Sequence, residues 1–585
     1  MQGWWRGIAT AVLVVAASTR GAPAAAQVPG GGADILPPLP ESGFGVPSTT
    51  FPPNAVSPPS AAPAETPSLR LPAPGAGIVT LQQNEPSAPA ILIQPQAAVA
   101  EAFTDNARAT ATNRVADAET RLIPGISISA DTPRLQGILS GQVEYDKYAI
   151  ATDQDQLFGD LFAKGTVTAI PDNLFVDLDS SISQANRFGG IGFAPVSQTT
   201  QSQLTQVFTS SLSPYLRKSY DGLVDTELRY RFSATDFGGN TGALATTPTG
   251  ALIPGVTTTP AGAFIPALSN SIFNEGTATV ATGSNFERLL SKLTLDASKL
   301  DGGFVTNSRI SDYDDVEYRI TSLVAALGRI GYENIHYLQV PTATTTGLLW
   351  QVGGRLDLGP DGQYVIVRYG KEEGIYGFSG SLRYAVTPAT IVTASATQGI
   401  GSTQEEIQNN LIDTNLNQYG QLVNQYDQPT AFANPEFVLQ NDVVRARRYE
   451  AAVRTIIDVN TFNLLAFYER QSSFVTQTPP STSVGANFFW SRQIRPDLTG
   501  NASLGYAHAT NLTFVTPTAT ATLSSATDST TASLGVNYLF GQGLTGSVVY
   551  TLSYQSSAPT TVSSGTIATG NILVNRLEFR LSKTF

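Results

Sequence analysis

Two histidines are the first candidates for chemistry in this 585-residue sequence, which contains no cysteine. His336 precedes Tyr337, and His508 shares an alternating apolar face with Leu504 and Tyr506. A hydrolase would need such a histidine hydrogen-bonded to a serine or an acid, and the spacing indicates no such pair. No G-x-S-x-G or phosphate-binding glycine loop occurs. We therefore predict no catalytic residue and no cofactor, and we keep a membrane-embedded hydrolase as the weakest alternative.

Four acids, Asp312, Asp314, Asp315 and Glu317, cluster near a predicted outer loop. Calcium prefers carboxylate and carbonyl oxygens, but this spacing matches no recognised calcium loop. We favour a solvated acidic turn over a cation site, and we predict no bound metal.

Charged residues at every second position form a larger group. They are Asp177, Asp179, Asp225, Glu227, Arg229, Arg231, Arg448, Glu450, Arg454, Arg576, Glu578 and Arg580. On a strand these positions share one face. If the other face meets lipid, the charged face must line a wet lumen, where it could select solutes or simply pair charge with charge. We favour the second interpretation.

The elements that would carry these charges are long amphipathic strands. Between Leu223 and Phe232, apolar and charged residues alternate, and the same period of two recurs near 533–540 and 547–554. Many such runs last 10–15 residues, enough for a tilted strand to cross a bilayer. Charged residues make up 14% of the chain, against about 25% in soluble proteins, which suits a wall between lipid and water.

Short turns and long connections alternate along the chain. Turn formers such as Asp221-Gly222 mark the short side, and the long connections include 106–120, 151–161, 237–285 and 402–440. This asymmetry is typical of outer-membrane barrels, whose turns are short on the periplasmic side. We predict an all-β transmembrane up-and-down barrel of about 22 strands, within a range of 18–22, narrowed by loops 237–285 and 402–440 folding inward.

Three segments organise the chain. Residues 1–26 have a charged start, a short apolar run and an Ala24-Ala25-Ala26 end, which together are typical of a cleaved signal peptide. Residues 27–90 are rich in proline and predict a disordered periplasmic linker, either idle or a tether. Residues 91–585 form the barrel.

The last residues predict how the barrel is recognised for assembly. Leu577, Phe579, Leu581 and Phe585 share the apolar face of the final strand. A terminal phenylalanine on such a strand resembles the outer-membrane assembly signal, although Lys583 stands where that signal favours an apolar residue. A secreted sandwich or solenoid would need neither this end nor the loop asymmetry.

The sequence also resembles the outer-membrane β-barrel family associated with PEP-CTERM/exosortase systems, which occurs beside exopolysaccharide genes. The resemblance covers most of 95–401. Its motifs are EAFTDN at 101–106, IPGIS at 123–127, Gly165-Thr166 with PDNLFVD at 171–177, SPYL at 213–216 with ELRYR at 227–231, and the stretch 350–384. It implies an outer-membrane barrel rather than a chemistry, and the insertions at 241–285 and 404–440 depart from it.

We therefore expect a Gram-negative outer-membrane conduit or envelope component, linked to exopolysaccharide or surface-protein export, with the linker and C-terminus in the periplasm. The expected partners are outer-membrane lipid, lipopolysaccharide, the barrel-assembly machinery and export components. A net charge of -12 without a basic run argues against nucleic acid. The main alternative is a non-conducting structural or adhesion barrel that acts through its outer loops.

Overall fold

A computed structural model describes most of the chain beyond residue 89. The described residues are 90–186, 204–238, 243–246, 252–258, 264–266, 268–302, 306–338, 343–359, 363–416, 422–423, 437, 439, 443–474, 480–510, 526–541, 543–557, 560–562, 565–567 and 571–585. The predicted signal peptide and almost all of the predicted linker lie outside them.

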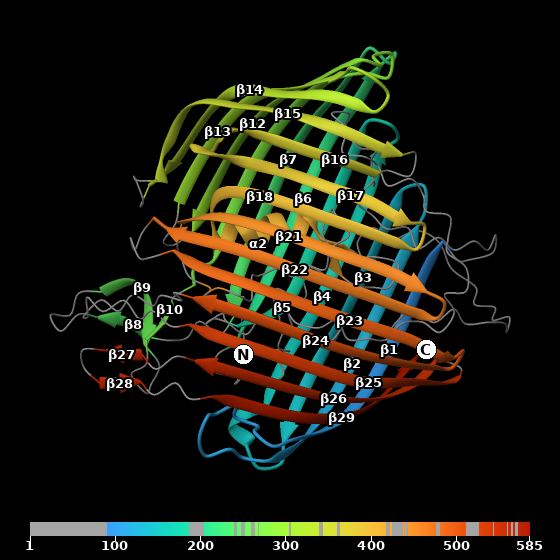
Figure 1. Ribbon diagram of the computed structural model, residues 1–585, viewed down its shortest axis with the longest axis vertical. Helices are drawn as coiled ribbons and strands as arrows, with labels where there is room; N and C mark the ends of the chain where they lie inside the picture. The colour runs from blue at the N-terminus through green and yellow to red at the C-terminus, as the bar shows by residue number, and fades with distance from the viewer. Residues whose placement is uncertain are drawn as a thin grey trace. The chain divides into compact units, whose positions relative to one another are not determined.

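One antiparallel sheet of 22 strands contains most of these residues (Figure 1). Its strands are β1 (Ile91–Thr104), β2 (Asp117–Asp131), β3 (Leu135–Tyr148), β4 (Gln156–Ile170), β5 (Leu174–Asn186), β6 (Leu204–Tyr220), β7 (Val224–Gly238), β11 (Ser271–Thr282), β12 (Leu289–Gly302), β13 (Thr306–Arg319), β14 (Val324–Tyr337), β15 (Thr345–Gly359), β16 (Gln363–Glu372), β17 (Ile375–Thr387), β18 (Thr390–Ser402), β21 (Val443–Ile457), β22 (Asn460–Ser473), β23 (Ser481–Arg495), β24 (Leu498–Thr510), β25 (Thr527–Gly541), β26 (Leu544–Ser557) and β29 (Ile572–Thr584).

The sheet closes on itself because the first strand pairs with the last. The register of β1 with β29 runs from Thr104 opposite Arg576 to Gln96 opposite Thr584, and the Phe585 amide donates to the Pro95 carbonyl at 2.9 Å. Closure leaves no sheet edge unpaired, which is what hydrocarbon requires of a strand-built wall. The predicted fold class and the count of 22 strands are confirmed.

The two faces of the wall differ in chemistry. Along β25, Leu534 is 60% exposed and Val536 is 42% exposed, whereas the intervening Ser533 and Asn537 belong to the polar face. Exposed large apolar side chains recur on one parity of the other strands in the same way. The apolar parity faces outward, because a helix that joins distant parts of the ring contacts the other parity, as described below.

The connections at one end of the barrel are short and those at the other end are mostly long, as expected, but some predicted connections need correction. Positive φ angles at Asp221 (50°) and Gly222 (70°) form a tight turn between β6 and β7, and only residues 458–459 separate β21 from β22. However, β12 and β13 are three residues apart, and β16 and β17 two, at the end that carries the long loops. Parts of the predicted connections belong to barrel strands, chiefly 117–120 in β2, 156–161 in β4 and 271–282 in β11. In these stretches the alternation of side chains, rather than the nearby turn formers, decides the structure.

The long loops contain a few small elements. These are η1 (Thr152–Gln154), β8 (Ala243–Thr246), β9 (Leu252–Thr258), β10 (Phe264–Pro266), α2 (Thr403–Asp413), β19 (Asn415–Leu416), β20 (Leu422–Val423), β27 (Thr560–Val562) and β28 (Gly565–Ile567). Within the described ranges, no helix has the length and apolar character to cross a bilayer. Of these elements, α2 is the one whose position in the lumen is described below.

Candidate functional site: the barrel lumen and its helix

Helix α2 crosses the inside of the barrel. It begins immediately after β18, yet it packs against β5, β6 and β7, which lie on a distant part of the closed ring. A helix that joins distant strands of a closed ring must lie inside it. The predicted inward folding of 402–440 therefore holds for 403–413, whereas residues 417–421, 424–436 and most of 437–442 lie outside the described part.

An apolar cluster holds the C-terminal half of the helix. Ile407 and Leu411, both almost fully buried, pack with Phe162 of β4, Val207 of β6 and Phe237 of β7. This half of α2 presents apolar residues at positions i and i+4, which share one helix face. Burying such side chains contributes roughly 1.5–3 kcal/mol each, so the helix is attached to the wall rather than loosely placed in the lumen.

Polar contacts fix both ends of α2. Ser402 and Glu405 form a capping box at its start, and the Asn307 amide donates to the Glu405 carboxylate at 2.5 Å. At the other end, Lys164 Nζ donates to the carbonyls of Ile412 at 2.7 Å and Thr414 at 3.1 Å. A cation at a helix C-terminus also complements the helix dipole. These contacts orient the helix across the lumen.

Another part of the same wall, formed by β21 and β22, carries charges that act on the helix through Glu406. Glu406 is half-buried, and Arg448 of β21 and Glu469 of β22 act on it electrostatically. Burial and the negative charge of Glu469 raise the pKa of Glu406 to about 7, while Arg448 opposes that shift. The charge of Glu406 can therefore change near neutral pH.

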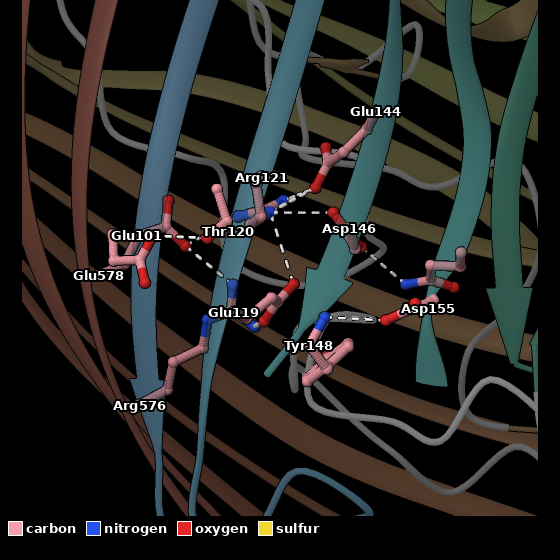
Figure 2. A network of polar contacts seen from close by, with 11 residues as sticks. Glu101, Glu119, Thr120, Arg121, Glu144, Asp146, Tyr148, Asp155, Arg576 and Glu578 are labelled. Carbon is pink, nitrogen blue, oxygen red and sulfur yellow. Dashed lines mark hydrogen bonds and ion pairs between the residues drawn. The ribbon is translucent and has the colours of Figure 1, made fainter. Parts of the chain in front are cut away.

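Buried charges concentrate where the barrel closes (Figure 2). Arg121 of β2 donates to Glu144 of β3 and, at 2.8 Å, to Glu578 of β29, and Arg576 lies 2.7 Å from Glu119. All of these side chains are less than 10% exposed. The ion pairs therefore join β2 and β3 to the last strand, β29, on the inside of the wall and across the first strand, β1.

Charged side chains also hold the loops that follow β1 and β3, next to this cluster. Arg108 pairs with Asp153 at 2.6 Å, and the Asp117 carboxylate accepts from the amides of Ile150 and Ala151. Hydrogen bonds from Arg108 lower the pKa of Asp153 well below its usual range. The pair stays charged at any mildly acidic pH, because only a strong acid protonates a carboxyl with so low a pKa.

The predicted lumen-lining residues lie mainly within ion pairs on the inward parity. Arg229 contacts Asp177 at 2.7 Å and Glu227 at 3.0 Å, and Arg448 contacts Glu450 at 3.0 Å. The remaining contacts are Arg231 with Glu275, Lys164 with Asp179, and Arg576 with Glu578. Asp225, Arg454 and Arg580 occupy the same parity of their strands. Opposite charges thus contact one another along the wall.

Several inward residues are not among those predicted from the sequence. Glu119 falls within a predicted loop, and Arg121, Glu144 and Asp146 are absent from the predicted lumen lining. The alternation in Asp117-Ala-Glu-Thr-Arg121 is the signal that could have found the first two. Lys164 carries no such signal, because its role depends on a helix 239 residues further along the chain.

The acidic cluster is not a loop. Asp312 to Glu317 lie within β13, with Asp315 and Glu317 facing inward and paired to Arg329 and Arg319. Asp314 lies on the other parity and accepts from Ser291 at 2.7 Å. The predicted acidic turn is therefore wrong, because a strand separates adjacent acids onto opposite faces. No group of metal-ligating side chains suited to a metal ion occurs in the part of the chain that is described.

The two histidines lie near the long-loop end. His508 Nδ1 contacts Asp528 Oδ1 at 2.8 Å. The sequence did not indicate that this histidine pairs with an acid. Tyr506 and Ser556 also donate to Asp528, so the serine contacts the acid rather than the histidine. This arrangement does not place a nucleophile on the base. His336 contacts the Thr344 hydroxyl at 3.4 Å.

Comparisons with known proteins concern the fold alone. No protein-family model matches the chain, and no curated protein sequence is similar to it. Among solved structures, it is similar to a ferric enterobactin receptor (PfeA) mutant from Pseudomonas aeruginosa (9% identity, 84% of this chain, 80% of that chain, TM-score 0.38). It is also similar to the ferric-catecholate import receptor Fiu from E. coli K12 (10%, 84% and 81%, 0.43) and to the outer membrane protein opdK from Pseudomonas aeruginosa (8%, 84% and 99%, 0.29).

Proposed function

We propose that the chain is an integral outer-membrane barrel that acts as a passive conduit, with α2 as the element that restricts its lumen. The observation that carries this proposal is the position of α2 across the inside of a closed, 22-stranded wall. The outward apolar face supports a place in a bilayer, because 22 antiparallel strands with an apolar outside satisfy every condition for a spanning barrel.

One sector of the inner wall supports an uncharged, hydroxyl-rich solute. Most inward side chains of β23–β26 are small or polar, as in the Ser503–Ser533 pair at 2.7 Å and the Asn501–Asn537 pair at 3.3 Å, although the large Phe489 also faces inward. In the described part of this sector, charged residues occupy the outward face or a turn, as with Arg492 and Asp497. Hydroxyls and amides match a sugar chain without fixed charge. A role in exopolysaccharide export fits this sector.

The remaining features of the proposal follow from the sequence. We propose an exported chain with a cleaved signal at 1–26, a linker at 27–90 and a C-terminus in the periplasm. Leu577, Phe579, Leu581 and Phe585 would present the assembly signal, and the apolar belt would contact outer-membrane lipid and lipopolysaccharide. The link to a PEP-CTERM/exosortase system rests on the resemblance alone.

The same helix also favours a second candidate function. Because α2 is held by an apolar cluster on one wall and by a capping box at the other, the barrel could be a closed structural or adhesion component that acts through its outer loops. Conductance separates the two functions.

The test replaces residues 403–413 with a glycine-serine segment of equal length and compares single-channel currents in planar bilayers. We expect small or intermittent currents in the unaltered protein and larger, steadier currents without the helix, because the lumen is then wider. Exchanging only Asn409 and Asn410, which do not belong to the apolar cluster that holds α2, for serine is the control and should leave the current unchanged. An absence of current in both proteins would reject the conduit and leave the structural barrel.

A further inference from the structure

Two neighbouring strand pairs separate at the long-loop end of the wall. The register of β4 with β5 begins at Leu161 opposite Ile182, although β4 starts at Gln156 and β5 continues to Asn186. The register of β17 with β18 begins at Gly380 opposite Ala396, although β17 starts at Ile375. In every other neighbouring pair, over the described strands, the register at this end reaches the last residue of the shorter strand or the one beside it.

Side chains replace the missing ladder at the β4–β5 separation. The Gln206 amide, from β6, donates to the Gly159 carbonyl at 2.6 Å and accepts from the Gly159 amide at 3.4 Å. The Gln206 side chain thus makes the hydrogen bonds to Gly159 of β4 that the backbone of β5 would make in a continuous sheet. A side-chain bond of this kind can break without unfolding either strand, because β4 remains paired with β3 and β5 with β6.

The β17–β18 separation is bridged in the same way. The Ile400 amide donates to the Glu373 carboxylate, and the Ile400 carbonyl accepts from Tyr337 and Arg309 at 3.4 Å. Arg447 reaches from β21 to the Tyr376 carbonyl, also at 3.4 Å. Each free strand end keeps its full pairing on its other side.

Apolar residues occupy both faces of the wall at these two places. On the inside, the two larger apolar clusters of the described residues lie there: one contains Phe162 and Ala185 of β4 and β5, and the other contains Ile375 and Ile400 of β17 and β18. On the outside, the free ends expose large apolar side chains. These are Leu157 at 63%, Tyr376 at 56% and Phe378 at 62%.

Helix α2 connects the two separations. Its N-cap, Ser402, is the last residue of the free end of β18, and its C-terminus is held by Lys164 of β4, just beyond the free end of that strand. Displacing the helix would therefore loosen both places together.

We propose that these two separations, β4–β5 and β17–β18, are lateral openings through which the hydrocarbon chain of an amphipathic molecule passes between the lumen and the membrane. Unpaired backbone is costly in hydrocarbon, so side chains must satisfy such ends, and a side-chain contact can break while each strand keeps its pairing on the other side. The polar part of the molecule stays in the hydroxylated lumen while its chain crosses between apolar faces. The inference rests on the proposed membrane conduit and adds a second route to it.

The test uses the absence of native cysteine. Spin labels are attached to a Phe378→Cys/Gln398→Cys pair, which continues the β17–β18 register beyond Gly380 and Ala396. The control pair is Leu382→Cys/Ala394→Cys, which lies within the paired ladder. The labelled full-length proteins are placed in lipid nanodiscs, and distances are measured by pulsed electron paramagnetic resonance with decyl maltoside, with maltose or with neither.

We expect decyl maltoside to add a population of longer distances for the first pair and to leave the control pair unchanged, whereas maltose changes neither. A Leu157→Cys/Asn186→Cys pair, with Val167→Cys/Val176→Cys as its control, should behave in the same way at the other separation. Distances that do not respond to decyl maltoside at either place would overturn the proposal, as would an equal response to maltose. Channel currents of the same variants test the conduit separately, so the failure of one proposal can be told from the failure of the other.

Discussion

Arg121 is the residue on which the buried charges at the closure depend. Its guanidinium contacts Glu144 and Glu578, and Asp146 lies 3.5 Å away. Removing one partner of a buried ion pair leaves the other charge uncompensated in a poorly solvated place. Loss of Arg121 would therefore destabilise the closed wall by leaving the buried carboxylates without a compensating charge.

We expect Arg121→Met, which keeps most of the side-chain volume, to lower the free energy of unfolding by about 3–5 kcal/mol. Urea titration in lipid, followed by tryptophan fluorescence, measures the change. Arg108→Met removes the exposed pair with Asp153 and should leave the midpoint where it is, because exposed pairs contribute little. Equal midpoints for the Arg121 variant and the unaltered protein would show that the cluster is solvated and not structural.

Helix α2 links the wall to the lumen at the scale of an element. Its pH dependence follows from Glu406, whose pKa is raised from 4.5 to about 7 in the folded protein, first by burial. A raised pKa means that the seated helix holds the proton more tightly than the released one. Protonated Glu406 therefore stabilises the seated helix. This stabilisation is complete below pH 4.5, is lost as the pH rises to about 7, and does not change further at higher pH.

Currents measured at pH 5 and pH 8 test this directly. We expect larger or more frequent openings at pH 8, where the charged Glu406 favours release of the helix. Glu406→Gln keeps the size of the side chain and should remove the difference between the two pH values, leaving the low-pH behaviour at both. If Glu406→Gln retained the full pH response, another group would be the sensor.

The strands were predictable from the sequence, but the helix was not. Alternation such as Val224 to Phe232 reports the two solvents of the wall at each residue, so the strand count and the faces of Arg576 and Glu578 follow from local pattern. The position of α2 depends on Phe162, Lys164 and Val207, and the helix, which is distant along the chain, reaches these residues only when the ring closes. The pairing of His508 with Asp528 likewise joins two strands whose relative register no local pattern fixes.

At the scale of the whole molecule, the closed ring separates two environments, and each face of its strands matches one of them. The 22 strands form a ring in which the outward parity is mainly apolar and the inward parity carries mainly paired charges or hydroxyls. Shifting a strand by one residue would place its charges in lipid, at roughly 2–4 kcal/mol for an arginine at mid-depth. The alternation therefore fixes the register as well as the fold.

Spin labels placed singly along β25 measure this claim most directly. In lipid bilayers, collision with dissolved oxygen reports contact with hydrocarbon. We expect high oxygen accessibility at residues 532, 534 and 536 and low accessibility at 533, 535 and 537, with a period of two. A uniform profile, or maxima on the serine and asparagine parity, would contradict a barrel whose apolar face lies in the membrane.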